Sequence, residues 1–578
     1  MHPGQPPAGP ARRRLITACS LALVCSALAW PGPTSAGSGP VRSRGGLVVA
    51  QEATAAEVGA AVLAEGGNAV DAAIATAFAL AVTHPTAGNL GGGGFLVWRH
   101  HAGAAAAYDF RETAPAAAGP DMWLGRDGRY DEDRHHWSWA SVGVPGTVAG
   151  LHLAWQEQGS LPWARLLTPA MALARGGVVV GESLARSLAA KWERLAPHPA
   201  SRDQFGRDGR PLAVGDTLRQ PDLARTLARI ATAGPDGFYG GETADLLVAA
   251  MRSHGGLITR ADLAAYRAVR REPVRGRYHG CELIGMPPPS SGGVILLEML
   301  NVLAGFDLAT AGRDSAQVVH LLAETMRRAY ADRARYLGDP EANPGQPVAR
   351  LLDPSHADSL RATIDPDRAS RSDPARFPWP DESPETTHLS VVDAAGSAVA
   401  LTTTLEYGYG SGIVVPGAGF LLNNEMGDFN AGPGLTDATG EIGTAPNLAR
   451  PGRRMLSSMA PTIVVRDGRL LMVTGAMGGR TIITTVLQTI LNVLVFGMNA
   501  QEAVDAGRIH HQWLPDRILV EPLALAPGVR AQLEGMGHGV EEADRRYSAG
   551  VIVVEPDGTL AAGVDRRDAG AGAGVPVR

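Results

Sequence analysis

The strongest constraint in this sequence is an abrupt change of texture between Glu385 and Thr386. The stretch before the change, residues 373–385, is rich in Pro, Asp and Ser (DPARFPWPDESPE), a composition typical of an exposed, extended linker. The segments that follow, His388–Val392 and Ala398–Leu405, alternate or run apolar, which predicts two buried strands. The junction is therefore a place where an exposed linker meets a buried strand.

A threonine at such a junction can serve a particular chemistry. Its hydroxyl is a poor nucleophile unless a base removes the proton. If the peptide bond before Thr386 is cut, the freed α-amine titrates near ~8 and can act as that base close to the operating pH. The junction therefore predicts that the chain cuts itself between Glu385 and Thr386 and uses Thr386 as its nucleophile. The pattern alone leaves an alternative open, because paired threonines before a strand also reflect β propensity.

The rest of the chain predicts packed sheets clad by helices, an α+β fold. After the junction we expect a long apolar helix over Thr481–Val495 and strands at Ile413–Val415, Gly419–Leu422, Thr462–Val465 and Leu470–Thr474. Asp467-Gly468 predicts the hairpin turn between the last two strands. Before the junction we expect helices over Ala55–Glu65 and Ala69–Val82, a strand at Phe95–Trp98, and a mostly helical region over about 178–381.

A serine pair and a glycine pair flank the last predicted hairpin. Ser457 and Ser458 precede it, and Gly478 and Gly479 follow it, just before the helix that opens at Thr481. A Gly-Gly pair lets backbone N–H groups approach a substrate, as an oxyanion hole demands. A plain glycine turn at a helix start is the alternative.

Two acids follow a predicted buried strand in the stretch NNEMGDF. These acids, Glu425 and Asp428, are in a position to hold a cation. A solvated turn is the alternative when this stretch is considered alone.

The first 36 residues have the parts of an export signal. Arg12–Arg14 form a charged start, Leu15–Ala29 form a hydrophobic run, and Thr34–Ala36 offer small residues for cleavage. Ala27–Ala29 is a rival cleavage site, and the arginines also permit twin-arginine export. A membrane anchor is the alternative, but the run is short for spanning and Trp-Pro-Gly-Pro follows it. We expect a periplasmic or extracellular protein that has no membrane anchor after signal removal.

The charge pattern argues against several partners and chemistries. The formal net charge is −6, with arginines and acids interspersed, so the basic stripe of a nucleic-acid-binding protein is missing. Lys191 is the only lysine and lies in a polar, helical stretch. A Walker phosphate loop and Schiff-base catalysis both need a placed lysine, so neither is expected.

Disulfide and metal chemistry find little support in the sequence. Cys19 and Cys25 lie in the expected signal, which leaves Cys281, expected in a buried strand, as the one cysteine of the mature chain. The pairs His135-His136 and His510-His511 lack further ligands at metal-binding spacing. We therefore expect no metal and no cofactor.

A series of long motifs runs in one order over roughly residues 46–578. They are GGNAVDAA (66–73), VTHPTAGNLGGGGF (82–95), DFRETAP (109–115), GVPGTVAG (143–150), MPPPSSGG (286–293), TTHLSVVD (386–393), GFLLNNEMGDF (419–429), LSSMAPTIV (456–464), GAMGGRTIITTVLQ (475–488) and RIHHQWLPD (508–516). The set resembles the γ-glutamyltransferase (glutathione hydrolase) family of the N-terminal nucleophile hydrolase superfamily. The resemblance implies a four-layer αββα sandwich formed jointly by two self-cleaved subunits. The implied parts are a signal peptide (1–36), a large subunit (37–385) and a small catalytic subunit (386–578).

The resemblance also implies roles for individual residues. Thr386 matches the nucleophile, and Thr404 matches the second threonine that assists it. The remaining matches are Arg111, Ser457 and the adjacent Ser458 for the donor's α-carboxylate, Glu425 and Asp428 for its α-ammonium, and Gly478 and Gly479 for the oxyanion hole. A zwitterionic γ-glutamyl group needs an arginine fork for its carboxylate and acids for its amine.

The implied activity is the transfer of a γ-glutamyl group from glutathione or a related donor through an ester on Thr386. Water, an amino acid or a dipeptide amine then accepts the group, and the two subunits remain a heterodimer. Glu406 stands where the family usually has asparagine, which puts amine recognition in question. Thr439 stands near the position of a lid tyrosine found in some members. The alternatives are a glutaryl or cephalosporin acylase of the same fold and a non-catalytic exported binding protein.

Overall fold

The computed structural model describes residues 39–373, 386–434, 444–543, 548–567 and 570–576. The expected signal peptide (1–36), Glu385 and Thr439 lie outside the described residues. From Pro40 onward the chain forms one unit. No helix in the described part is long and apolar enough to cross a membrane.

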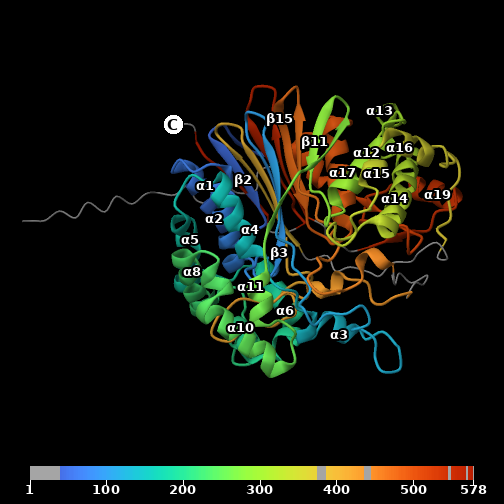
Figure 1. Ribbon diagram of the computed structural model, residues 1–578. Helices are drawn as coiled ribbons and strands as arrows, with labels where there is room; N and C mark the ends of the chain where they lie inside the picture. The colour runs from blue at the N-terminus through green and yellow to red at the C-terminus, as the bar shows by residue number, and fades with distance from the viewer. Residues whose placement is uncertain (1–38, 374–385, 435–443, 544–547, 568–569, 577–578) are drawn as a thin grey trace, which may run out of the picture. The chain divides into compact units, whose positions relative to one another are not determined.

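Two seven-stranded sheets lie at the centre of this unit (Figure 1). The first sheet has the order β1 (Val41–Ser43), β20 (Leu560–Val564), β19 (Ala549–Val554), β15 (Arg469–Ala476), β14 (Thr462–Arg466), β11 (Cys281–Gly285) and β10 (Val274–Tyr278). The second has the order β21 (Ala571–Gly574), β2 (Gly46–Ala50), β12 (Thr386–Asp393), β13 (Ala398–Thr404), β3 (Gly93–Arg99), β4 (Ala105–Asp109) and β9 (Val269–Arg271). All neighbouring strands in both sheets are antiparallel.

The two sheets pack face to face, and β12 sends alternate side chains to opposite faces. Leu389 and Val391 join the core that the second sheet shares with its helices, whereas Val392 joins the core between the sheets. The period of two follows from strand geometry. Thr386 and His388 have the parity of Val392 and therefore belong to the face that meets the first sheet.

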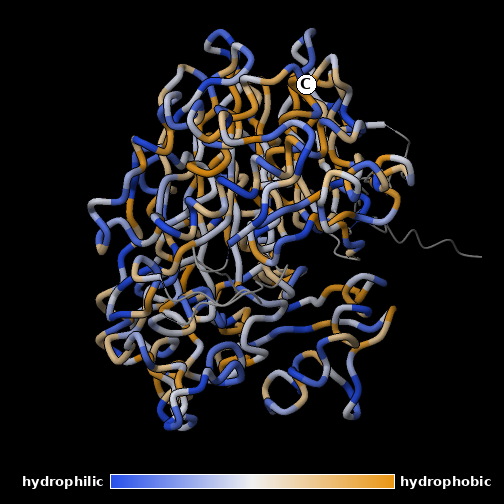
Figure 2. The backbone as a smooth tube through the Cα atoms, turned by 90° about the vertical axis from the view of Figure 1, so that its right-hand side faces the viewer, coloured by the Kyte–Doolittle hydropathy of each residue, from blue (hydrophilic) through white to orange (hydrophobic). Residues whose placement is uncertain are grey.

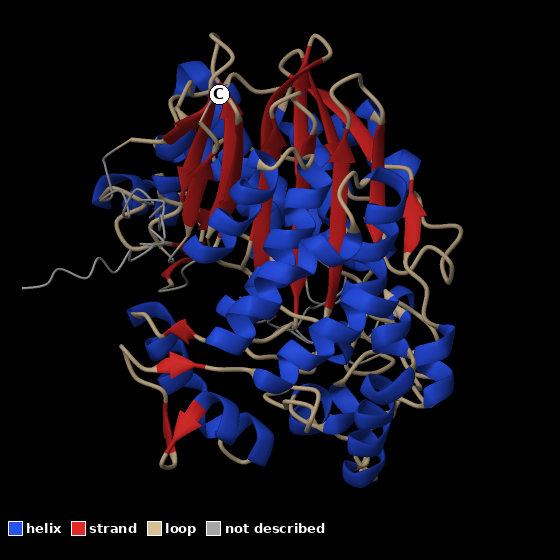
Figure 3. Ribbon diagram, turned by 90° about the vertical axis from the view of Figure 1, so that its left-hand side faces the viewer, coloured by secondary structure: helices blue, strands red, loops and turns tan. Residues whose placement is uncertain are grey.

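Helices cover the outer faces of both sheets and complete four layers (Figures 1 and 3). The second sheet carries α1 (Ala53–Ala64), α2 (Ala69–Thr83) and α4 (Thr147–Gln158), with α5 (Trp163–Gly176) and α8 (Pro221–Ala233) beyond them. The first sheet carries α12 (Gly292–Leu303), α17 (Thr481–Leu494) and α18 (Ala500–Asp505), with α14 (Ala316–Tyr336) packed on α12. Every residue of the alanine-rich α2 is buried, as expected for a helix that is apolar all round.

Figure 2 shows the hydrophobic stretches gathered mainly within the sheets and the helices that cover them.

Shorter elements complete the unit. The remaining helices are α3 (Glu132–His136), η1 (Trp139–Ser141), α6 (Glu182–Leu195), α7 (Pro199–Phe205), α9 (Asp236–Tyr239), α10 (Gly241–His254), α11 (Arg260–Ala265), α13 (Leu308–Ala311), α15 (Val348–Leu351), α16 (Pro354–Arg361), η3 (Glu425–Asp428), η4 (Ala445–Asn447) and α19 (Pro527–Gly535). The remaining strands are β5 (Val178–Val179), β6 (Gly206–Arg207), β7 (Arg210–Pro211), β8 (Thr217–Leu218), β16 (Ile509–His510), β17 (Ile518–Val520) and β18 (Val540–Glu542).

The predicted αββα architecture is confirmed, and one pair of predicted strands is wrong. The segments 413–415 and 419–422 form no ladder, and only an isolated bridge joins Val414 to Leu421. Gly417, between the segments, and Gly419, at the start of the second, have φ of 76° and 77°, and the chain reverses there. Backbone N–H groups of Val415 and Leu422 donate across this turn to the carbonyls of Phe420 and Ile413. Between residues 178 and 373 the chain is mostly helical, and it also supplies β9, β10 and β11 to the two sheets.

Candidate active site

Thr386 is the first residue of β12, a strand in the interior of the second sheet between β2 and β13. In the register of that sheet it lies opposite Thr404, the last residue of β13. Both threonines are nearly buried, each with 4% of its surface exposed. The Thr404 hydroxyl accepts a hydrogen bond of 2.8 Å from the backbone N–H of Glu406. The chain therefore turns directly after Thr404 and brings Glu406 to the same end of the sheet.

His388 is the histidine nearest to Thr386 along β12, and it is unsuited to act as the base. Its two ring nitrogens lie 2.9 Å and 3.0 Å from the hydroxyls of Thr402 and Ser390. Burial lowers the pKa of His388 to about 3, so the ring is neutral. A Cβ atom on Gly475 of the first sheet would lie 2.3 Å from the ring, so the imidazole acts as a spacer between the sheets.

A pocket opens beside Thr386 and gathers most of the residues that the sequence singled out. It is lined by Arg111, Thr386, Thr404, Glu406, Asp428, Ser457, Ser458, Met459, Gly479 and Ile482. Of the predicted site residues that the structure describes, Gly478 and Glu425 are outside this lining. Glu425 is fully buried directly behind it, against Arg111. The structure thus brings together residues from both sides of the 385–386 junction.

Arg111 is the centre of a buried charge cluster. Its Nη1 atom lies 2.5 Å from a carboxylate oxygen of Glu425 and 3.5 Å from one of Glu112, and its Nη2 atom donates to Asp428. The Tyr266 hydroxyl donates a 2.8 Å hydrogen bond to the backbone carbonyl of Arg111 and fixes this turn. Glu112 was not predicted as a site residue, although it follows Arg111 in the DFRE motif.

The pKa values of this cluster reflect burial and crowding. Burial alone would lower the pKa of Arg111, but the charges of Glu425, Asp428 and Glu112 raise it above its ordinary value. Burial raises the pKa of Glu425 and of Glu112, and the guanidinium only partly offsets this effect. The cluster therefore has more acid than its single guanidinium can neutralise, and it favours either protons or an added cation.

Glu406 lines the pocket and is nearly buried, with 6% of its surface exposed. Its Oε1 atom lies 3.1 Å from Nδ1 of His136. The His136 ring stacks on Tyr407, with centroids 5.1 Å apart. The buried Arg454 pairs with another acid, since its Nε atom lies 3.4 Å from a carboxylate oxygen of Asp109.

The serine pair is held by the large segment before the junction. The Ser458 hydroxyl accepts a 2.8 Å hydrogen bond from Nη2 of Arg333, whose Nε donates to Ser291 at 2.6 Å. The backbone of Ser457 pairs with Pro289 and Ser291 at 3.0 Å and 2.8 Å. The sequence did not indicate a role for Arg333, because it lies on α14, outside all of the motifs in sequence.

The glycine pair lies at the turn before α17, and Gly479 lines the pocket that holds Thr386. Gly478 and Gly479 have φ of 127° and 55°, which a side chain would disfavour. Within the described part of the chain, neither backbone N–H group makes a hydrogen bond, while the Gly478 carbonyl accepts from Thr481. Unpaired backbone donors at this turn are what an oxyanion hole would need.

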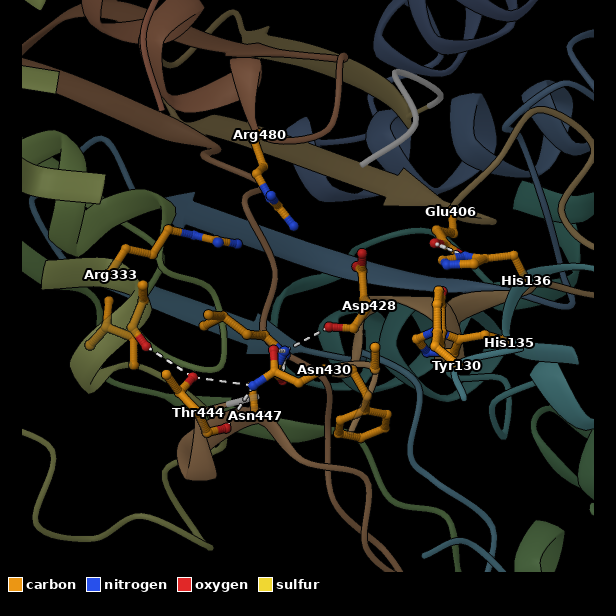
Figure 4. Close-up of a pocket in the computed structure, with 16 residues that line it drawn as sticks. Tyr130, His135, His136, Arg333, Glu406, Asp428, Asn430, Thr444, Asn447 and Arg480 are labelled. Carbon is orange, nitrogen blue, oxygen red and sulfur yellow. Dashed lines mark hydrogen bonds and ion pairs between the residues drawn. The ribbon is translucent and has the colours of Figure 1, made fainter. Parts of the chain in front are cut away.

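A second pocket adjoins the first, because Glu406 and Asp428 line both (Figure 4). Figure 4 shows Arg333 and Arg480 on the side away from Glu406 and His136, with their guanidinium groups directed toward the interior of the pocket. The Asp428 carbonyl accepts a 2.7 Å hydrogen bond from the side-chain amide of Asn447. The second pocket therefore combines cations on one side with acids on the other.

A threonine that opens an interior strand of an antiparallel four-layer sandwich is the arrangement of the N-terminal nucleophile hydrolases, and the fold places this chain in that class.

Known proteins narrow the class to a family. The model of the γ-glutamyltranspeptidase family matches residues 55–575. The chain is 46% identical over 532 residues to the glutathione hydrolase proenzyme of Escherichia coli (strain K12), covering 91% of each chain. It is similar to the solved cephalosporin acylase from Bacillus halodurans, with a TM-score of 0.82, 28% identity, and coverage of 94% of this chain and 98% of that one. It is also similar to the Helicobacter pylori γ-glutamyltranspeptidase, with a TM-score of 0.54, 41% identity, and coverage of 55% and 91%. The chain belongs to the γ-glutamyltranspeptidase family.

Proposed function

We propose that this chain is a self-processing amidohydrolase and acyltransferase that cleaves γ-glutamyl amide bonds of glutathione and related donors. The observation that carries the proposal is the pocket in which Thr386 lies beside Arg111, Asp428 and Ser457. Relatives named glutathione hydrolase proenzyme, which are 43% to 46% identical to this chain, support it.

The charge balance of the pocket supports a donor with a free α-amine. One guanidinium, that of Arg111, lies among four carboxylates, those of Glu112, Glu406, Glu425 and Asp428. A substrate ammonium would neutralise part of this excess. A glutaryl group has no amine and would leave the buried acids uncompensated, so the acylase alternative fits less well.

The proposed mechanism assigns one role to each of these groups. The Thr386 hydroxyl transfers its proton to the freed α-amine and attacks the γ-carbonyl carbon, while Gly478 and Gly479 donate N–H groups to the oxyanion. The proton passes to the departing amine as the C–N bond breaks, leaving a γ-glutamyl ester on Thr386. Water or the amine of an amino acid or dipeptide then attacks the ester and restores the threonine. These steps need no cofactor.

Self-cleavage at the junction should yield two chains of about residues 37–385 and 386–578. They should stay associated, because each sheet contains strands from both sides of the junction. A denaturing gel of the purified mature protein should show two bands. Edman sequencing of the smaller chain should begin Thr-Thr-His. A single uncut chain with full activity would contradict the mechanism.

Replacing Glu406 by asparagine or glutamine should flatten the pH dependence of donor affinity. Like charges crowded together hold protons in the empty site, and these protons must leave when the donor ammonium binds. Affinity should therefore rise with pH across the range where these acids titrate, and fall toward acid pH more steeply in the wild type than in either neutral variant. Donor affinity measured from about pH 5 to 8 tests this. Parallel curves would show that Glu406 does not influence the amine.

We further propose that residues 1–36 direct export to the periplasm or the extracellular space and are then removed. The sequence of this segment supports the proposal, although it lies outside the described residues. N-terminal sequencing of the large chain purified from the cell envelope should begin near residue 37 or near residue 30, according to which cleavage site is used.

A further inference from the structure

A second cluster of ionisable side chains lies on the helices that cover the first sheet, outside both pockets. It contains Glu298 on α12, Asp332 on α14 and His356 on α16. The Nε2 atom of His356 lies 2.8 Å from a carboxylate oxygen of Asp332 and 3.8 Å from one of Glu298. All three potential ligand atoms lie within 4.8 Å of one another. Three helices that are separate in sequence thus direct metal-binding atoms to one point.

Glu298 is the observation that points to a ligand. Its side chain is 0% exposed, and neither carboxylate oxygen has a hydrogen-bond donor among the described residues. A buried carboxylate is costly unless it is neutralised and paired. A cation held between Glu298 and Asp332 would supply the partner that the Glu298 carboxylate lacks among the described residues.

We propose that Glu298, Asp332 and His356 bind one divalent transition-metal ion, preferentially zinc. One imidazole nitrogen and two carboxylate oxygens suit zinc, whereas magnesium and calcium prefer oxygen ligands alone. The side chains of Asp332 and His356 are 13% and 16% exposed, so an ion can enter from solvent and keep water as a fourth ligand.

The neighbouring cluster of His320, Glu324 and His538 shows why the ligand set matters. There, His320 and His538 are hydrogen-bonded directly, with 2.8 Å between ring nitrogens, and the other His320 nitrogen lies 2.8 Å from the Asp365 carbonyl. Glu324 is held by Arg327 and Arg328, which compete with a cation. The potential ligand atoms of that cluster are therefore already engaged by hydrogen bonds and ion pairs within the protein, unlike the carboxylate of Glu298.

A bound ion would act as a clamp. It would join α16 to α12 and α14. On α14, Arg333 lines the second pocket, and the Tyr330 hydroxyl donates a hydrogen bond to the backbone carbonyl of Arg480. The ion would not touch the substrate. Its effect should therefore appear in metal retention and thermal stability.

The test uses the untagged, processed full-length protein, stripped with EDTA, incubated with zinc chloride and desalted. Metal analysis should give about one zinc per chain for the wild type and less than about a tenth of that for Glu298→Gln and His356→Gln. Glutamine at position 298 keeps the shape of the side chain and can donate an amide hydrogen bond to Asp332, so this variant should fold. A double variant of the half-buried His100 and the exposed His101, His100→Asn with His101→Asn, controls for surface binding and should retain zinc as the wild type does.

Two further readouts separate a site from adventitious binding. Cobalt chloride should give the visible absorption of a low-coordinate cobalt site in the wild type and not in His356→Gln. Zinc should raise the Tm of the stripped wild type and leave that of Glu298→Gln unchanged. The proposal is overturned if the wild type retains no zinc, or if both glutamine variants retain as much as the wild type. The three residues would then form a network that shares a proton.

Discussion

Replacing Thr386 by alanine is expected to abolish both self-cleavage and amidase turnover. In the proposed mechanism the same hydroxyl attacks the preceding peptide bond and the donor carbonyl, and the neighbouring Thr387 faces the opposite side of β12. His388 is neutral and engaged by two hydroxyls, so it cannot substitute. Removing a hydrolase nucleophile typically costs on the order of 10⁶-fold in kcat. A denaturing gel and an assay with a γ-glutamyl anilide measure the two effects on one preparation.

Two variants control this experiment. Thr386→Ser keeps a hydroxyl and should retain part of both activities. Thr387→Val changes the neighbouring threonine, which lies on the opposite face of β12 and is also buried, so it should process and turn over normally if it folds. Substantial amidase activity in Thr386→Ala would show that another group is the nucleophile.

Replacing Arg111 by lysine is expected to raise the Michaelis constant for the donor strongly. The planar guanidinium reaches Glu425 and Asp428 through separate nitrogens, and an ammonium is a point charge that cannot reproduce this fork. A hydrogen bond to a charged group is worth about 1.5–3 kcal/mol, which corresponds to roughly a 10- to 150-fold loss of affinity. Self-cleavage should be unaffected, since it involves no donor.

Arg454→Lys is the matched control for this prediction. Arg454 is also a buried arginine that pairs with an acid, Asp109, but it does not line the pocket. Its replacement should lower the Tm without changing the Michaelis constant. If Arg111→Lys behaves in the same way, with an unchanged Michaelis constant, the role of Arg111 is structural.

Local patterns in the sequence were sufficient to predict much of the fold. The turn at Asp467 and Gly468 has φ of 50° and 74°, as an Asp-Gly hairpin requires, and the flanking strands lie within about two residues of their predicted limits. The segments 413–415 and 419–422 were predicted as strands because their apolar residues are buried, but they are joined only by an isolated bridge and belong to no sheet. A short apolar run shows that a segment is buried, but it does not show whether the segment is hydrogen-bonded into a sheet.

The candidate site was predictable as a set of residues but not as a set of contacts. The motifs identified Arg111, Glu425 and Asp428, yet no motif indicated that the arginine would lie on the acids. The partner of Glu406 was missed for a similar reason, because His136 lies 270 positions earlier and was considered only as one of a histidine pair. Contacts between residues so far apart in sequence depend on how the sheets assemble. Neither the hydrophobic periodicity nor the motif spacing contains that information.

Each sheet combines strands from before and after the junction, and this affects how the protein would unfold. In the second sheet β2 lies between β21 and β12, and in the first sheet β14 lies beside β11, so neither segment forms a complete sheet alone. Before a cut at residue 385, unfolding is a unimolecular event whose midpoint is independent of concentration. After the cut, the unfolded state consists of two separate chains, and refolding becomes a second-order encounter. Processing would thus make unfolding largely irreversible. The lifetime of the processed protein would then be set by its unfolding rate and not by an equilibrium free energy of unfolding.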